Sequence, residues 1–153
     1  MPRRATPTDV PAIAQLWRAL LDLHAAIDPA HRLRAAADDT LAAEARRALG
    51  DASAALWVAG ASAGVVGFCL ARHEAAPRHA VETGRVLVTE LFVAASARRR
   101  GVGRALVAAA LEWARERGAA RVEVRVAARN AEGQAFWRAQ GFGDFVDVLD
   151  RRL

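Results

Sequence analysis

Residues 86–103 read VLVTELFVAASARRRGVG, and this stretch decides the fold. Its first eight residues, Val86–Val93, are almost continuously apolar, which is typical of a central strand covered on both faces. Ala94–Arg100 predict a loop, and Gly101-Val102-Gly103 begin a helix whose apolar residues recur at helical spacing. The stretch therefore predicts a strand, an arginine-rich loop and an amphipathic helix in direct succession.

The segments on either side alternate between helical and strand patterns. The elements expected before the stretch are a strand at Arg3–Ala5, a helix from the N-cap Thr8 to about Ala26, a helix at 38–49, and a β-hairpin of Ala54–Ala59 with Val65–Leu70 around a turn near Ser62. Those expected after it are a strand at Arg121–Val126, a helix capped by Asn130 and ended by Gly141, and a last strand at Phe145–Leu149. This order predicts one α+β domain over residues 1–153, built on a mixed, mostly antiparallel sheet flanked by helices.

Composition excludes several classes of protein. Hydrophobic residues make up 54% of the 153 residues, so a disordered chain is excluded. The lone Cys69 rules out an internal disulfide, its apolar flanks favour a buried thiol, and the four histidines show no metal spacing. The first nine residues lack the apolar region of a signal peptide, and the uncharged run Ala52–Ala71 fits the hairpin better than a membrane span. We expect a cytoplasmic protein with no metal and no membrane partner.

The arginine-rich loop indicates an anion site. The first N–H groups of a helix lack intrahelical acceptors, and the helix dipole adds positive potential there. Gly101 and Gly103 leave the backbone open to phosphate oxygens, although a solvated basic turn would show the same residues. The Walker A loop is excluded because the chain has no lysine, and the dinucleotide motif because Leu106 stands where it needs a third small residue.

Two segments together resemble the GNAT superfamily of N-acetyltransferases. Residues 98–103, RRRGVG, are similar to its acetyl-CoA motif, Arg/Gln-x-x-Gly-x-Gly/Ala. Residues 130–142, NAEGQAFWRAQGF, are similar to its second signature, in which Asn-x-x-Ala-x-x-x-Tyr precedes Gly-Phe. The element order also fits, so the resemblance covers essentially the whole chain. It implies that the two central parallel strands splay apart around acetyl-CoA, which serves as cosubstrate.

The resemblance also implies a role for each matching position. Backbone groups of Leu91, Phe92 and Val93 would pair with the pantetheine arm, and Asn130 would contact that arm or order the cofactor loop. The positions expected to bind the cofactor are Leu91, Phe92, Val93, Arg98, Arg99, Arg100, Gly101, Val102, Gly103, Arg104, Asn130, Phe136 and Trp137. Acceptor specificity would come from the first two helices, the loop after His73 and the C-terminal strand, where Asp28, His31, Glu74, Glu82 and Asp144 are the candidate contacts.

Glu90 is the candidate catalytic base, because it interrupts an apolar strand where burial raises carboxylate basicity. The alternative is a structural carboxylate paired with an arginine such as Arg125. Whether Glu90 or Thr89 faces the site depends on a bulge in the strand. The tyrosine that often serves the family as general acid corresponds to Trp137, whose indole cannot deliver a proton at neutral pH.

The expected reaction is direct attack of a primary amine on acetyl-CoA in a ternary complex, with a small molecule or a protein as acceptor. An acyl-CoA-binding protein without turnover is the alternative, because Trp137 replaces the tyrosine. A nucleic-acid-binding protein is less favoured; its basis is the net charge of +5, carried by 22 arginines. Homodimerisation is common in such folds, but no residue pattern here indicates it, and the acceptor amine is not named by the sequence.

Overall fold

A computed structural model describes residues 1–32, 37–61 and 64–151, and the predicted turn near Ser62 lies outside these ranges. The sheet has the order β1-β2-β3-β4-β5, with antiparallel pairs throughout except for the parallel pair β4–β5. The strands are β1 (Pro2–Arg4), β2 (Ala54–Ala61), β3 (Gly64–Ala75), β4 (Gly84–Val93) and β5 (Arg121–Val124). The helices are α1 (Val10–Ile27), α2 (Ala37–Gly50), α3 (Val102–Glu116) and α4 (Ala131–Ala139), with short 3₁₀ turns at Pro7–Asp9, Pro29–His31 and Ala95–Ala97. The predicted α+β class is confirmed.

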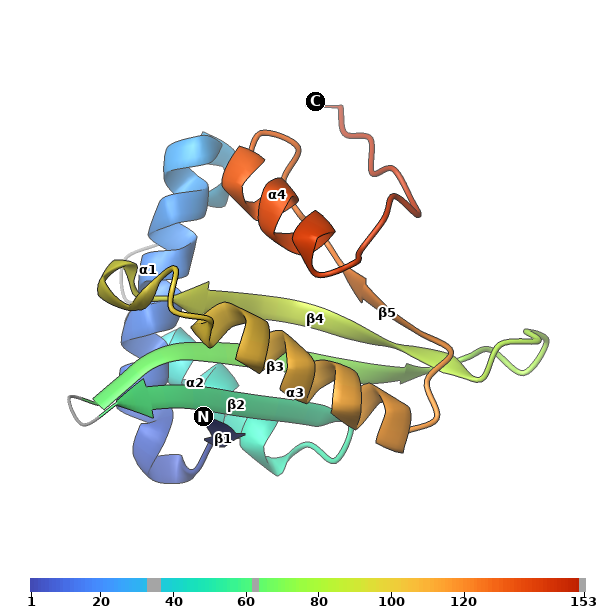
Figure 1. The fold of residues 1–153 in the computed structure, drawn as a ribbon, viewed down its shortest axis with the longest axis horizontal. Helices are drawn as coiled ribbons and strands as arrows, with labels where there is room; N and C mark the ends of the chain where they lie inside the picture. The colour runs from blue at the N-terminus through green and yellow to red at the C-terminus, as the bar shows by residue number, and fades with distance from the viewer. Residues whose placement is uncertain (33–36, 62–63, 152–153) are drawn as a thin grey trace.

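Helices cover both faces of the sheet (Figure 1). Alternating side chains of the strands divide between the two faces. On β2, Leu56 and Val58 join the core under α1 and α2, whereas Trp57 packs with α3. Cys69 is buried on the α3 face, as predicted for an inert thiol. The sheet is therefore a central layer between two apolar cores.

A bulge in β4 opens the centre of the sheet. The register with β3 pairs Leu70 with Glu90 and Ala71 with Val88, so Thr89 is the extra residue. The parallel pairing with β5 ends at the neighbouring residue, where Val88 lies beside Val124. Among the described residues, the second half of β4 consequently has no strand beside it on the β5 side. β4 and β5 are the splayed pair of strands that the resemblance implied. Because the two strands separate there, β5 ends at Val124, two residues before its predicted end.

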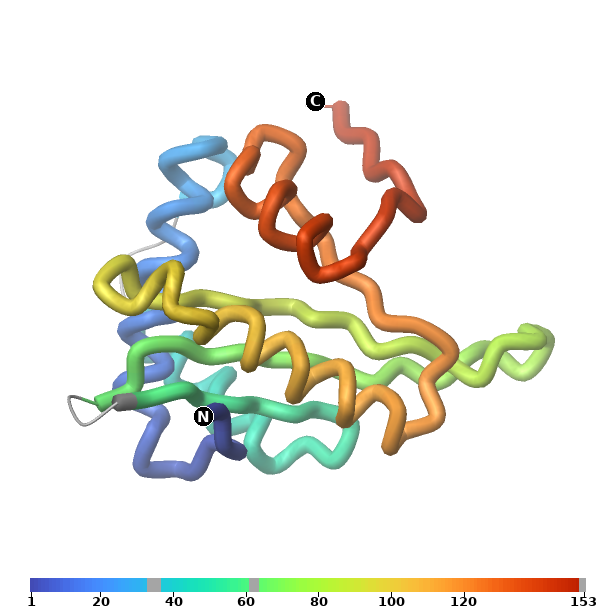
Figure 2. Tube along the Cα trace, in the orientation of Figure 1, coloured from blue at the N-terminus to red at the C-terminus, as the bar shows by residue number. Residues whose placement is uncertain are grey.

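Two details of the predicted secondary structure are wrong. The segment Phe145–Leu149 forms no strand: it leaves α4 and runs away from the sheet (Figures 1 and 2). An ion pair of Arg138 with Asp144 holds its start, and Arg121 of β5 lies over the Phe145 ring. The segment nevertheless does not pair with the outer edge of β5, which stays free among the described residues, and its apolar side chains are exposed. Thr8 does not cap the first helix. Thr6 and Asp9 instead form a capping box over the 3₁₀ turn that precedes α1.

Asp9 joins β1 to the start of α1. Its buried carboxylate accepts two hydrogen bonds from Arg3, at 2.7 and 2.8 Å, and further bonds from the backbone N–H and hydroxyl of Thr6. The hydrogen bonds from Arg3, followed by those from Thr6, hold the pKa of Asp9 well below its ordinary value, although burial acts in the opposite direction. Asp9 is thus a stabilising carboxylate remote from the sheet centre.

We expect Asp9→Asn to lower the melting temperature at pH 7. A carboxyl whose native pKa is depressed adds stability above its unfolded pKa of about 3.9, and loses that contribution as pH falls towards the native value. The difference in melting temperature between wild type and Asp9→Asn should therefore begin to shrink near pH 4 and keep shrinking as the pH falls further towards the native pKa. A difference that stayed constant across this pH range would show that the charge of Asp9 is not the stabilising feature.

Candidate active site

A cleft of about 860 Å³ lies where β4 and β5 separate. Every residue predicted for catalysis or cofactor binding lines it except Arg100. Its walls come from α1 (Leu20, Leu23, His24), β4 (Val88, Thr89, Glu90, Leu91, Phe92, Val93), the loop and start of α3 (Ala97, Arg98, Arg99, Gly101, Val102, Gly103, Arg104), the end of β5 with the loop after it (Val124, Arg125, Val126, Ala127, Asn130), and α4 (Glu132, Gly133, Ala135, Phe136, Trp137, Gln140). The two sequence segments that carry the resemblance thus share one cleft.

One end of the cleft is built to hold an anion. The first backbone bond of α3 runs from the N–H of Ala105 to the carbonyl of Gly101, so the preceding N–H groups have no intrahelical acceptor. Arg99 and Gly101 have positive φ values of 61° and 80°, and such alternation turns successive N–H groups toward one concave side. Backbone donors, the helix dipole and the Arg104 side chain all favour a phosphate at this end.

Gly103 allows α4 to close over this end of the cleft. A Cβ at Gly103 would lie 3.2 Å from the ring of Phe136, tighter than ordinary packing. The residue is thus needed for the close approach of Phe136 to the start of α3, a reason that the sequence motif alone did not give. Gly101 is different, since a Cβ there would meet nothing within 4 Å and only its left-handed backbone favours glycine.

Arg98 and Asn130 order the segments around the anion end. The Nε atom of Arg98 donates to the Val93 carbonyl at 3.0 Å, and its guanidinium lies over the ring of Phe92, 5.6 Å from the centroid. The Oδ1 atom of Asn130 accepts from the Gly133 N–H at 3.0 Å and caps α4. Both residues line the cleft, and both connect the loops around it to neighbouring elements.

Glu90 lies at the bulge, on the face of the sheet that α1 and α2 cover. Its side chain is largely buried, and its Oε2 atom has no hydrogen-bond partner among the described residues. Burial raises the pKa of this carboxyl, Glu44 acts in the same direction, and hydrogen bonding to Thr89 and the charge of Arg72 oppose them. The side chain is consequently a carboxyl of increased basicity beside the unpaired half of β4.

The alternative role considered for Glu90 was a structural ion pair. Arg125 lines the same cleft, but no ion pair joins it to Glu90 in the part of the chain that the structure describes. Thr89 and Glu90, one of which was expected to face the site, both line the cleft at the bulge. The Thr89 hydroxyl donates to the Leu70 carbonyl at 3.4 Å, across the bulge.

The far end of the cleft is formed by the second half of α1. Leu20, Leu23 and His24 line it together with Thr89 and Glu90, and the sequence alone did not single them out. Their spacing of three and four residues marks one face of a helix, but the same spacing is expected of any core-facing helix. The five acceptor contacts suggested by the sequence do not line the cleft, and Glu74, Glu82 and Asp144 are each paired with an arginine.

Comparison with known proteins identifies the family. Residues 17–142 match the acetyltransferase (GNAT) family, and this range contains the strand, loop and helices that form the cleft. The chain belongs to the GNAT acetyltransferase family. No curated protein sequence matches it.

Solved structures of GNAT-like fold superpose on the whole chain. A tetramutant of the BH1408 protein from Bacillus halodurans is 16% identical, with a TM-score of 0.89 over 100% of this chain and 99% of that one. The aminoglycoside N-acetyltransferase AAC(6')-Iy in complex with CoA is 21% identical, with a TM-score of 0.74 over 100% and 98%. AAC(6')-IG from Acinetobacter haemolyticus is 17% identical, with a TM-score of 0.79 over 100% and 97%. At these identities the likeness shows a shared fold.

Trp137, at the position of the tyrosine in the GNAT signature, is enclosed by aromatic neighbours. It is 8% exposed and belongs to the core beneath α3. Its ring packs edge-on against Phe136 and Phe142, with centroid separations of 5.3 and 5.0 Å. Trp137 therefore forms a rigid aromatic wall of the cleft, and its indole offers no proton at neutral pH.

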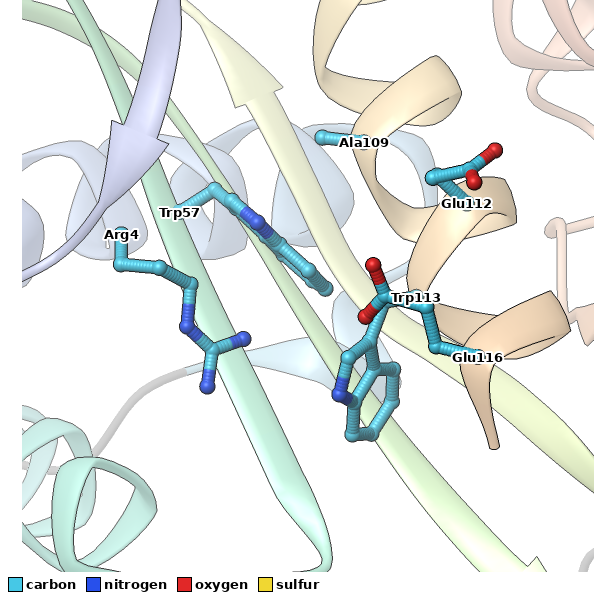
Figure 3. Close-up of a pocket in the computed structure, with 6 residues that line it drawn as sticks. All are labelled: Arg4, Trp57, Ala109, Glu112, Trp113 and Glu116. Atoms are coloured by element: carbon cyan, nitrogen blue, oxygen red, sulfur yellow. The ribbon is translucent and has the colours of Figure 1, made fainter.

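A second hollow, of about 490 Å³, lies away from the GNAT motifs, between α3 and the edge of the sheet (Figure 3). Arg4, Trp57, Glu112, Trp113 and Glu116 surround it, and Arg4 lies over the Trp57 ring. Both tryptophans are buried core residues. The hollow is a seam in the packing of α3 on β1 and β2, and it contains none of the site residues.

The described residues show neither a metal-ligand cluster nor a membrane-spanning helix. Within residues 1–32, 37–61 and 64–151, no three His, Cys, Asp or Glu side chains come together as metal ligands. In the same ranges no helix is both long and apolar enough to cross a lipid bilayer.

Proposed function

We propose that this chain transfers the acetyl group of acetyl-CoA to a primary amine by direct attack in a ternary complex. One observation carries the proposal: a single cleft contains both the start of α3, which favours an anion, and the carboxyl of Glu90, beyond the point where β4 and β5 stop pairing. The neighbouring AAC(6')-Iy, solved with CoA, has the same fold. Family membership, the open strand and the N–H groups of α3 therefore agree on an acyl-CoA cosubstrate.

The cofactor would lie along the cleft. The N–H groups of Arg99–Arg104 and the arginine side chains would hold the pyrophosphate at the start of α3. The backbone edge of Leu91–Val93 on the β5 side would pair with the pantetheine arm, next to the Val93 carbonyl that already accepts from Arg98. Phe136 and Trp137 would pack against the arm from α4 and exclude water. This arrangement directs the thioester toward the bulge at Thr89 and Glu90.

At the bulge the amine nitrogen attacks the thioester carbonyl, so that a C–N bond forms and the C–S bond breaks. Glu90, when ionised, accepts the proton that the nitrogen loses, directly or through water. Backbone N–H groups of the unpaired half of β4 stabilise the developing oxyanion. Since Trp137 cannot protonate the leaving thiolate, water or the proton released by the amine does so.

The proposal is tested by release of free CoA with a panel of primary amines. A thiol reagent reports CoA without interference, because the single cysteine, Cys69, is fully buried and burial raises its thiol pKa. Amine-dependent release is the expected result. Binding of acetyl-CoA without release by any amine would favour the alternative, an acyl-CoA-binding protein without turnover, which the buried Trp137 supports. A cytoplasmic location and a single domain stay predictions from the sequence, and homodimerisation stays an expectation from similar folds alone.

A further inference from the structure

The acceptor end of the cleft has an apolar wall. Leu20 and Leu23 line the cleft from α1, and Leu20, which is 7% exposed, belongs to the core on the α1–α2 face of the sheet. Leu23 is 39% exposed, which makes it one of the exposed large hydrophobic residues of the described chain. Removing an exposed apolar side chain from water is favourable, so a ligand with apolar surface that covers Leu23 would bind more tightly.

The described lining at this end carries one carboxylate, and a second, Glu44 on α2, acts on it from outside the lining. Glu90 is the one described carboxylate on this part of the lining, and burial favours its neutral form. The other carboxylate of the cleft, Glu132, lies at the anion end, 3.9 Å from Arg98. On α1 and α2, Asp22 and Asp38 both bind Arg18, which offsets their charge.

His24 completes this wall as a neutral group. Burial, and to a smaller degree the nearby His31, lowers the pKa of His24, so its imidazole is uncharged at neutral pH. The His24 and His31 rings are 5.9 Å apart. A neutral imidazole can stack on a flat ring or accept a single hydrogen bond, but it does not attract a cation as a carboxylate does.

We propose that the acceptor is a monoamine carried on an apolar body, such as an arylalkylamine, which Leu20, Leu23 and His24 recognise beside Glu90. This inference rests on the proposed function and names the substrate class of the same site. The proposed acceptor differs from the aminoglycosides named for acetyltransferases of similar fold. An aminoglycoside or polyamine would lose hydration from several ammonium groups against a wall with one carboxylate. The net charge of +5 would also repel a polycation at long range.

The test compares 2-phenylethylamine, spermidine and kanamycin as acceptors, with CoA release as the readout. We expect kcat/KM for 2-phenylethylamine to exceed that for either polycation by roughly 100-fold, since unpaired charges in a site discriminate strongly. Leu23→Glu places a second carboxylate at the mouth. It should lower kcat/KM for 2-phenylethylamine and raise it for spermidine, which changes their ratio by about tenfold or more at an unaltered Kd for acetyl-CoA.

Leu149→Glu is the matched control, because Leu149 is also an exposed leucine but lies in the C-terminal segment outside the cleft. Its acceptor ratio should equal that of wild type. Turnover of kanamycin or spermidine in preference to 2-phenylethylamine would overturn this inference and leave the acetyltransferase proposal standing, as would an unchanged ratio in Leu23→Glu. Acetyl-CoA binding without turnover of any amine would overturn both.

Discussion

Replacing Glu90 with glutamine lowers kcat roughly 100-fold or more, if this carboxylate accepts the proton of the attacking amine. The amide keeps the size of the side chain but cannot act as a base. Wild-type kcat should fall as pH decreases through the raised pKa of Glu90, because protonation removes the base. The residual activity of Glu90→Gln should lack this dependence. A variant with wild-type kcat across the pH range would remove Glu90 from the mechanism.

The same substitution should stabilise the protein, which separates loss of chemistry from loss of fold. A carboxyl with a raised native pKa favours folding at low pH, and this contribution disappears as pH rises from its ordinary value of about 4.3 through the native value. Ionised Glu90 is then a buried charge whose Oε2 atom has no described partner. We expect Glu90→Gln to melt at a higher temperature than wild type at pH 8, and the difference to narrow at acid pH.

Replacing Gly103 with valine weakens acetyl-CoA binding by about 5- to 150-fold, the factor that 1–3 kcal/mol of overpacking gives. Even a Cβ at this position would be 3.2 Å from the Phe136 ring, and the branched side chain would also cover the N–H groups at the start of α3. Titration calorimetry with acetyl-CoA measures the effect.

Gly50→Ala is the control for this substitution. Gly50 lies at the end of α2, has no positive φ, and a Cβ there would meet nothing within 4 Å. It should bind acetyl-CoA as wild type does. Equal affinity in Gly103→Val and Gly50→Ala would show that the phosphate groups do not lie at the start of α3.

The sequence predicted the elements that local pattern determines. Val86–Val93 is a strand because its apolar run suits a strand covered on both faces, and Asn130 begins α4 because its side chain satisfies a backbone N–H. Gly118 and Gly141 end helices at positive φ, where glycine is favoured. These features depend on neighbours in the chain, so the residue types alone predict them.

Features that depend on distant contacts were less accessible. The last strand at Phe145–Leu149 was wrong because alternation shows which face a strand would bury but not whether the strand pairs; β5 leaves a free edge in the described sheet, and the segment does not use it. The contact of Gly103 with Phe136 joins residues that the sequence separates, so the motif gave a phosphate reason and missed the packing reason. Leu20, Leu23 and His24 look like an ordinary core stripe until the bulge in β4 is placed opposite them.

Calorimetric titration of the wild-type chain with acetyl-CoA at physiological salt tests the central claim most directly, with CoA, NAD and ATP as comparison ligands. Saturable binding of acetyl-CoA and CoA, with one ligand per chain and no comparable binding of NAD or ATP, is the predicted result. A folded sample that binds none of them, or binds all four alike, would contradict the assignment of the cleft between β4 and α4 to an acyl-CoA cosubstrate.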